Sequence, residues 1–540
     1  MPTPHTARSF HRLHLGFLPA LLTSWCAIAA QESKPIPPKP LPRTAPVSPS
    51  NVPSNAPNGI SGVRPLPGSG GRGPVTIAPP GNARPTRLPN GARTLDTREG
   101  NVSTRHDGKL ADVRIAGSGM EIHHNLTGNR RAAVEWSDHS RVVADLGMRG
   151  YVQRPFTYRG REYAQRTYFH HGRAYVRFYA PYPYRGAYLE MYAPTRYYRP
   201  QFYSWAYYRW AAPAPYAWGW SADPWYKYYG YYMMAYPMYP GPAYWLTDYL
   251  ISTSLAEAYQ SKIDAGMPVQ MPPFGASPIT PEVLDQIQRE VQRQLAIEAA
   301  EAPAAAQGGA PNPGLSGVPA LFQDHYSHIF VAAGDLDVVD TSGTECAISE
   351  GDVLQLQGPP PVDAAAADLV ILSNKGGQEC GRGVVVSVGL ADLQEMENHM
   401  RETIDRGLAE LQARQGTGGL QQIPQTGLGA PEQAAFAADP NVSAPYPAAG
   451  ALINQQAQDA DRAESQILGQ LPADAGSAIP APAALRPSGS SNVVSVGQSI
   501  AEVRANLGEP WGTVDVGATQ IHIYGNMKLT VEGGKVTDIQ

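Results

Sequence analysis

Apolar and polar residues alternate in short runs between residues 94 and 195, and turn-forming residues separate the runs. Gly117-Ser118-Gly119 and Thr127-Gly128-Asn129 are two of these turns. A period of two between turns is typical of antiparallel strands, so an antiparallel β domain, a meander or a sandwich, is expected over 94–195. The expected strands are 110–116, 120–124, 131–136, 141–146, 151–158, 162–169, 174–180 and 187–192.

Arginine and tyrosine alternate in two neighbouring expected strands, as Tyr163, Arg166, Tyr168 and as Tyr175, Arg177, Tyr179. Guanidinium groups stack well on aromatic rings, and side chains on one face of a pair of strands lie close together. The pattern therefore predicts a ladder of aromatic and guanidinium groups on one face of the sheet.

The pattern becomes helical after residue 245. Leu246, Leu250 and Leu255 recur near helical spacing, which predicts a helix over 245–263. A second helix should begin at Pro281 and run to about residue 301, because Thr280 can cap it and proline fits the first turn.

Short apolar runs return between residues 319 and 413. Strands are expected at 328–333, 336–339, 353–357, 369–373 and 384–388, with a tight turn at 348–354 and a helix over 390–411. This order resembles a small SH3-like barrel with a C-terminal helix, an analogy of fold that carries no function.

Residues 181–250 hold 19 of the 29 tyrosines and six of the nine tryptophans, and prolines recur among them. Proline interrupts long helices and central strands, so an irregular aromatic-rich segment is expected over 196–250. Three interpretations remain open: a core packed against its neighbours, a sugar- or peptide-binding surface, and a membrane-interface anchor. The candidate ligand-stacking residues are Trp218, Trp220, Trp225 and Tyr226.

The amino-acid composition predicts long disordered linkers between these parts of the chain. The 540 residues include 54 glycines and 52 prolines, more than usual, while 42% hydrophobic and 16% charged residues exclude a wholly disordered chain or a coiled coil. The fold class expected is a multidomain, mainly β protein with α+β parts. Its parts are a signal peptide (1–29), a disordered linker (30–93), an antiparallel β domain (94–195), an aromatic segment (196–250), a helical segment (251–302), a linker (303–318), a small barrel-like domain with a C-terminal helix (319–413), a disordered linker (414–491) and a C-terminal module (492–540).

The N-terminus has the features of a secretory signal. Arg8 and Arg12 precede an apolar stretch, and Ala27-Ile28-Ala29 offers small residues for cleavage. The bulky Trp25 before Cys26 argues against lipidation, and the apolar stretch is shorter than the ~20 residues that span a bilayer. The chain is therefore expected to be exported, to a periplasmic, outer-membrane-associated or extracellular location, without an integral membrane span.

Cys346 and Cys380 remain after cleavage, both in the expected small β domain. A disulfide is the favoured interpretation in an oxidising compartment, and two buried free thiols are the alternative.

Charge is distributed unevenly. The net charge is +8 over residues 1–92, +9 over 93–210 and −22 over 211–540. The Arg-rich half either attracts anionic envelope polymers or is neutralised by the acidic half, and the sequence leaves both open. No specific nucleic-acid binding is expected.

Sequence motifs identify no catalytic, cofactor-binding or metal-binding residues. The pairs His123-His124 and His170-His171 are interpreted as solvated strand or turn residues, since neighbours on a strand point to opposite faces. Asp223 and Glu190 are the one candidate acid/base pair beside the aromatic segment, the weakest of the hypotheses.

The C-terminal residues carry a family resemblance. Residues 496–510 read VGQSIAEVRANLGEP, 523–531 read IYGNMKLTV and 533–539 read GGKVTDI. Ser499 and Glu502 form a capping box, and Ile500, Val503 and Leu507 are spaced to face a sheet. About fifty residues thus resemble the BamE-like (SmpA/OmlA) outer-membrane assembly domain, which implies an α+β fold, an envelope location and binding of partner proteins. The remainder resembles uncharacterised bacterial envelope proteins.

These observations together predict a cell-envelope binding or scaffolding protein that is not an enzyme and has no cofactor. Its expected partners are envelope proteins, or anionic envelope polymers and glycans. The alternatives are a carbohydrate- or peptidoglycan-binding protein that uses the aromatic segment and, last, a glycan-acting enzyme.

Overall fold

The computed structural model describes residues 60–61, 90–170, 172–267, 275–324, 326–425, 429–470 and most of 498–539. The expected signal peptide and all of the first linker up to residue 89, apart from Ile60–Ser61, lie outside the described residues. None of the described helices is both long and apolar enough to cross a membrane. The structure is rich in antiparallel sheet with added helices, which confirms the coarse fold class.

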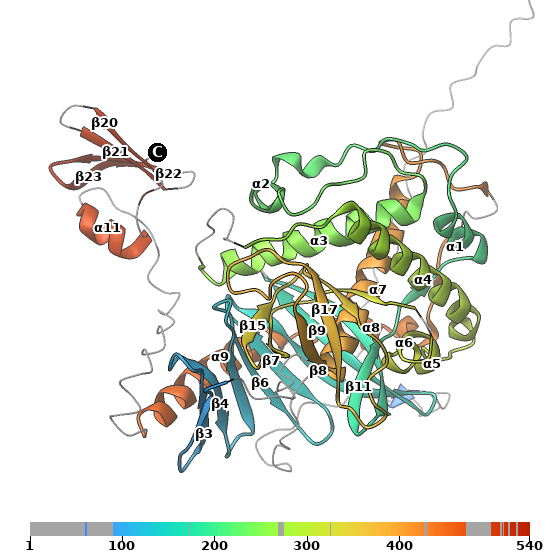
Figure 1. Cartoon of the computed structure of the whole chain (residues 1–540), viewed down its shortest axis with the longest axis horizontal. Helices are drawn as coiled ribbons and strands as arrows, with labels where there is room; N and C mark the ends of the chain where they lie inside the picture. Colours follow the sequence, from blue (N-terminus) through green and yellow to red (C-terminus); the bar gives the residue numbers. More distant parts are fainter. Residues whose placement is uncertain are drawn as a thin grey trace, which may run out of the picture. The chain divides into compact units, whose positions relative to one another are not determined.

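An antiparallel sheet of eleven strands occupies the first part of the described chain (Figure 1). Strands β2 to β11 follow one another as spatial neighbours, and β1 pairs with β8, so the sheet is a meander. Its strands are β1 (Ile60–Ser61), β2 (Arg93–Asp96), β3 (Gly100–Thr104), β4 (Leu110–Ile115), β5 (Met120–His124), β6 (Arg130–Glu135), β7 (Arg141–Asp145), β8 (Arg149–Tyr158), β9 (Arg161–His170), β10 (Arg173–Tyr184) and β11 (Ala187–Tyr192). All eight strands expected between 110 and 192 are present, and the pattern missed β2 and β3.

Two-residue turns fix the register of two hairpins of the large sheet. Arg159-Gly160 joins β8 to β9 and Arg185-Gly186 joins β10 to β11, and all four residues have positive φ. Both central residues of a type I′ turn need positive φ, and this turn matches the twist of paired strands. Glycine at the second position makes that conformation inexpensive.

A helix that the sequence analysis placed in a linker covers one face of this sheet. Residues 414–491 were expected to be disordered, but they contain α8 (Pro440–Ser443) and the 20-residue α9 (Ala449–Leu468). Ala449 and Ile453 pack on Val142 and Val152, and Ile467 reaches the core under β3 to β6. Figure 1 shows α9 beside strands β3 to β6 of the large sheet. The expectation was wrong for α9 because two of its four buried apolar residues, Ala449 and Ala460, are alanines, which are also common in linkers.

The aromatic segment is more regular than expected. It contains β12 (Arg196–Tyr197), α1 (Pro200–Tyr207), a 3-10 turn η1 (Gly219–Ala222) and α2 (Pro224–Tyr229), and it runs into α3 (Pro242–Asp264). Each of the three helices begins with a proline: Pro200, Pro224 and Pro242. The first residues of a helix donate no backbone hydrogen bond within it, so the missing N–H of proline costs the helix nothing there. The prolines therefore limit helix length without preventing helices.

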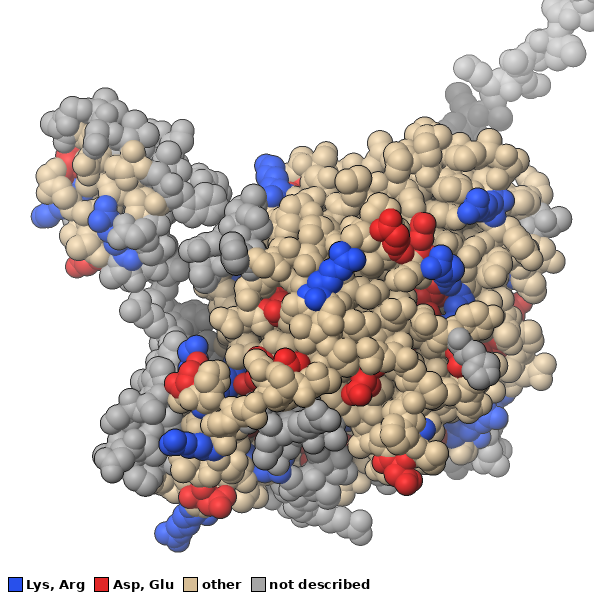
Figure 2. Space-filling model, in the orientation of Figure 1, with Lys and Arg blue, Asp and Glu red and all other residues tan. Residues whose placement is uncertain are grey.

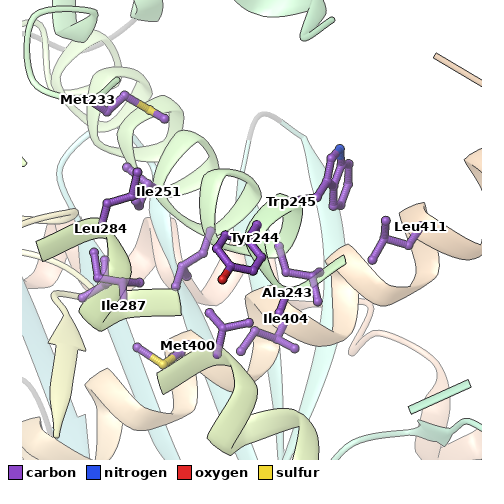
Figure 3. Packing of buried hydrophobic residues seen from close by; sticks show 14 of the residues in the cluster. Met233, Ala243, Tyr244, Trp245, Ile251, Leu284, Ile287, Met400, Ile404 and Leu411 are labelled. Carbon is purple, nitrogen blue, oxygen red and sulfur yellow. The ribbon is translucent and has the colours of Figure 1, made fainter. Parts of the chain in front are cut away.

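Three long helices form the centre of the largest apolar cluster. They are α3, α4 (Pro281–Ala306) and α7 (Leu390–Arg414), and Figure 3 shows Met400, Ile404 and Leu411 of α7 beside residues of α3. The Thr280 hydroxyl accepts a hydrogen bond from the Val283 amide at 3.4 Å, as the expected cap. Trp245, fully buried in this cluster, ties the aromatic segment to the helices.

A second antiparallel sheet has the strand order β13-β16-β17-β18-β14-β15, an open path from β13 to β15. Its strands are β13 (Ile329–Val331), β14 (Leu336–Asp340), β15 (Glu345–Ile348), β16 (Val353–Leu356), β17 (Ala366–Ser373) and β18 (Val385–Gly389), preceded by the short helices α5 (Pro313–Ser316) and α6 (Val318–Leu321). Its apolar cluster includes Tyr182 and Leu189 of the large sheet, so the two sheets share a core. Cys346 and Cys380 are joined by the expected disulfide, with their Cα atoms 5.0 Å apart.

The C-terminal module contains one helix and four antiparallel strands. They are α11 (Ile500–Leu507), β20 (Gly512–Val516), β21 (Thr519–Tyr524), β22 (Met527–Glu532) and β23 (Lys535–Ile539). Val503 is buried against Leu529 and Val531. Ser499 and Glu502 form the capping box: the Glu502 amide donates to the Ser499 hydroxyl at 3.3 Å, and the Ser499 amide donates to the Glu502 carboxylate at 3.1 Å.

Candidate functional site: a cleft lined by tryptophan, tyrosine and charged groups

A cavity of about 1020 Å³ lies against the large sheet. Strands β8 to β10 form one wall, and the aromatic segment, α3 and α7 form others. Residues Ser349 and Glu350, just before β16, also line the cavity. The cavity is thus assembled from segments more than 200 residues apart in the sequence.

The sheet wall carries the expected aromatic and guanidinium ladder. Arg166 lies 3.9 Å from the ring centre of Tyr179, and Tyr168 stacks on Tyr175 with ring centres 5.2 Å apart. Arg177 lies 5.1 Å from the Tyr175 ring. Tyr163 is on the opposite face, packed on Phe436, because an odd spacing from Arg166 reverses the direction of a strand side chain.

Two arginines of the sheet wall are paired inside the protein. Arg166 contacts Glu190 at 2.7 Å and Glu395 at 2.8 Å, and Arg177 contacts Glu402 at 3.4 Å. The pairs with Glu395 and Glu402 join the Arg-rich half to the acidic half of the chain, whereas Glu190 belongs to the Arg-rich half. Figure 2 shows charges of both signs scattered over the described residues of the face in view.

Two further arginines, which lie away from the cleft, also form ion pairs with carboxylates of the acidic half. Arg130 contacts Glu464 of α9 at 2.8 Å, and buried Arg105 contacts Asp337 and, at 3.1 Å, Glu345 of the small sheet. Internal neutralisation, one of the two interpretations left open by the sequence, therefore accounts for these residues.

Three of the four candidate stacking residues line the cleft. Trp218 and Trp220 are partly buried, with ring centres 5.3 Å apart, whereas Trp225 is only 8% exposed and belongs to the core. The Trp218 indole donates to the Tyr239 hydroxyl at 2.6 Å, which fixes its ring. Tyr226 packs on Trp220 in a tilted arrangement with ring centres 4.9 Å apart, but it is not among the described residues that line the cavity.

A group of ionisable side chains faces the same cleft. Glu257 of α3, Glu350 and His399 of α7 each place one ligand atom within 4.8 Å of the others. Glu257 also contacts Arg406 at 2.8 Å, and Ser254 lies 2.9 Å from His399 Nε2.

The environment separates the pKa values of these three groups. Burial alone would raise the pKa of Glu257, but the neighbouring Arg406 outweighs it and lowers the value to about 2. Burial, together with the charge of Glu257, raises the pKa of Glu350 well above its ordinary range. Burial lowers the pKa of His399 to about 4. At neutral pH the cleft thus presents a carboxylate, a carboxylic acid and a neutral imidazole side by side.

The sequence analysis did not single out these three residues. Glu350 lies in the turn expected at 348–354, where Gly351 has φ of 92°, but no spacing links it to Glu257 or His399. The three come from separate elements, and only the packing of α3 against α7 and the small sheet brings them together.

The histidine pairs differ from expectation. His123 contacts Asp112 at 2.7 Å and Asp337 at 3.1 Å, and His124 contacts Glu464 at 3.0 Å. His170 contacts Asp264 at 2.5 Å beside the cleft, while His171 lies outside the described residues. The three described histidines are therefore partners of carboxylates on other elements, and the interpretation as solvated residues was wrong.

Asp223 and Glu190 occupy different environments. Asp223 is exposed and lines the cleft before α2. Glu190 is buried on β11, held by Arg166 and by a hydrogen bond from Gln153 at 2.7 Å, and it is not among the described lining residues. The pair lacks the shared access to a ligand that acid/base catalysis needs.

Comparison with known proteins adds no further identification. No family model, no curated protein and no solved structure matches this chain.

Proposed function

We propose that the protein is a non-catalytic binding protein of the cell envelope that holds a glycan, such as a peptidoglycan strand, in the cleft. The observation that carries the proposal is the lining of one cavity by Trp218, Trp220 and the Arg/Tyr ladder. Sugar rings present apolar faces that stack on aromatic rings and hydroxyl groups that bind charged and polar side chains. A cavity of about 1020 Å³ is at the upper end of the usual ~300–1,000 Å³ for ligand sites.

The pairing of the arginines favours a glycan over a purely anionic polymer. Arg166 and Arg177 already contact carboxylates, so their charges are not free to attract phosphate-rich chains. The expected export signal and the disulfide agree with an envelope location. The BamE-like resemblance of the C-terminal module supports the same location and a second binding role toward envelope proteins.

The test is retention of the purified protein on purified peptidoglycan at ~1 M salt, where exposed charge attraction is screened over about 3 Å. Trp220→Ala and Trp218→Ala are expected to weaken binding at least tenfold, about 1.4 kcal/mol. Tyr208→Ala is the matched control, because Tyr208 belongs to the same aromatic segment but is 65% exposed. Tryptophan variants that bind as tightly as the control, or a wild-type protein without retention, would refute the glycan proposal.

Trp225 separates binding from stability. Its ring is buried, so Trp225→Ala is expected to destabilise the protein by about 3–5 kcal/mol. Trp220→Ala should lose far less, and the two variants together distinguish a ligand surface from a core.

A further inference from the structure

We propose that Glu257, Glu350 and His399 form a binding site for one divalent transition-metal cation of the Zn²⁺ class at the wall of the cleft. Their ligand atoms lie within 4.8 Å of one another. Zn²⁺ binds carboxylate oxygen and imidazole nitrogen at about 2.0–2.2 Å, so small side-chain rotations bring all three within reach. The group is the one set of described residues with this geometry. This inference does not depend on the glycan proposal.

The environment of Glu350 is the second observation that points to a cation. Glu350 is only 7% exposed. Among the described residues its one hydrogen-bond partner is the carboxyl group of Glu257, and it forms no ion pair. When both carboxyl groups are ionised they repel one another, and a cation between them would remove that repulsion.

Two other buried carboxylates of the described chain have such a charge. Asp352 contacts Lys375, and Glu190 contacts Arg166. Glu350 differs from them because no cationic side chain of the described residues forms an ion pair with it, and Arg149 acts on it only at longer range.

Hydrogen bonds around the cluster orient the ligands. The Ser254 hydroxyl donates its proton to the Leu250 carbonyl at 3.0 Å, so toward His399 Nε2 at 2.9 Å it accepts. This arrangement keeps the proton on Nε2 and leaves Nδ1 with a free lone pair for the metal. Arg406 holds Glu257 through Oε1, which leaves Oε2 for coordination.

The donor set also selects the class of ion. One imidazole and two carboxylates suit Zn²⁺ or a similar transition metal, whereas Ca²⁺ takes six to eight oxygen ligands. Three protein ligands leave a fourth position open. Because all three residues line the cavity, that position faces the cleft, where water or a ligand hydroxyl group would fill it.

The experiment is calorimetric titration of the untagged full chain with Zn²⁺, after exhaustive dialysis against chelator, with Ca²⁺ as the comparison ion. About one equivalent of Zn²⁺ should bind, at least tenfold more tightly than Ca²⁺. Glu350→Gln and His399→Gln should each weaken Zn²⁺ binding at least tenfold. Glu410→Gln, which changes another cleft carboxylate already paired with Arg414, should bind as the wild type does.

Glu350→Gln also distinguishes loss of the metal site from a folding defect. The glutamine amide can donate a hydrogen bond to Glu257, so the variant should keep the fold. Its melting temperature without metal should equal or exceed that of the wild type, and added Zn²⁺ should raise the wild-type melting temperature only. No saturable binding by the wild type, or equal Zn²⁺ affinity in Glu350→Gln and His399→Gln, would overturn the proposal.

Discussion

Arg166 is the residue whose removal should reveal most about what holds the cleft together. Its side chain is 2% exposed and contacts Glu190 at 2.7 Å, Glu395 at 2.8 Å and the face of Tyr179. Arg166→Met keeps much of the volume but removes the charge. Breaking a buried ion pair from one side costs about 3–5 kcal/mol, since the other charge stays buried without its partner.

The expected loss lies near the lower end of that range, about 3 kcal/mol. Glu190 would keep Arg141 at 3.6 Å and the Gln153 hydrogen bond at 2.7 Å. Glu395 is 24% exposed and can be solvated by water. A second substitution, Glu190→Gln, should therefore recover more of the lost stability than Glu395→Gln does.

The assay is urea unfolding followed by tryptophan fluorescence, with the main transition compared between the wild type and the three variants. The loss should also depend on pH. Burial would raise the pKa of Glu190, but Arg141 and Arg166 outweigh it and hold the pKa below its usual value. In the wild type this carboxylate therefore stabilises the fold above pH ~4.5, and the contribution is lost as the pH falls through the folded-state pKa.

Removing Arg166 raises that pKa, so the stability deficit should be largest at neutral pH and shrink toward pH ~5. A deficit below about 1 kcal/mol, or stronger recovery by Glu395→Gln than by Glu190→Gln, would refute the assigned role of the buried pair.

Three further predictions concern other parts of the fold. Burial alone would lower the pKa of His123, but Asp112 and Asp337 raise it to about 9, so its contribution to stability is complete below pH ~6.5 and is lost as the pH rises toward 9; His123→Gln should abolish this dependence in thermal melts. Cys346→Ser removes the disulfide, which closes a loop with a sequence separation of 34 residues, and should lower the free energy of unfolding in urea by about 3–4 kcal/mol. Adding reductant to this variant should cause no further change. Gly150→Ala should cost at least about 2 kcal/mol in the same assay, because φ is 149° and the added methyl group would meet a carbonyl of β7; unchanged stability would contradict this backbone geometry.

Local patterns predicted the elements of the fold well where each element has its own signal. The hairpins around Gly160 and Gly186 follow from turn chemistry and alternation, and the start of α4 follows from Thr280 and Pro281. The pattern failed for α9, whose buried positions include Ala449, Ala460 and two polar residues beside Ile453 and Ile467. Alanine is common both in helices and in linkers, so only contact with the sheet distinguishes them.

The candidate site could be predicted only in part. Trp218 and Trp220 stood out by composition, but the partly buried ring of Trp218 packs on Trp245 and that of Trp220 packs on Trp218, which no spacing encodes. Glu350 lies in an ordinary turn, and His399 lies on an amphipathic helix. Their proximity arises from three elements folding together, which is long-range information that local periodicity does not contain.

The late position of α9 in the chain has a consequence for biosynthesis. Strands β7 and β8 are complete by residue 158, yet the helix that covers Val142 and Val152 starts at residue 449, about 300 residues later. At a translation rate of ~5–20 residues per second, this apolar face of the sheet stays uncovered for about 15–60 s. A nascent chain in this interval displays a surface to which holdase chaperones bind, and a chain terminated before α9 would display it permanently.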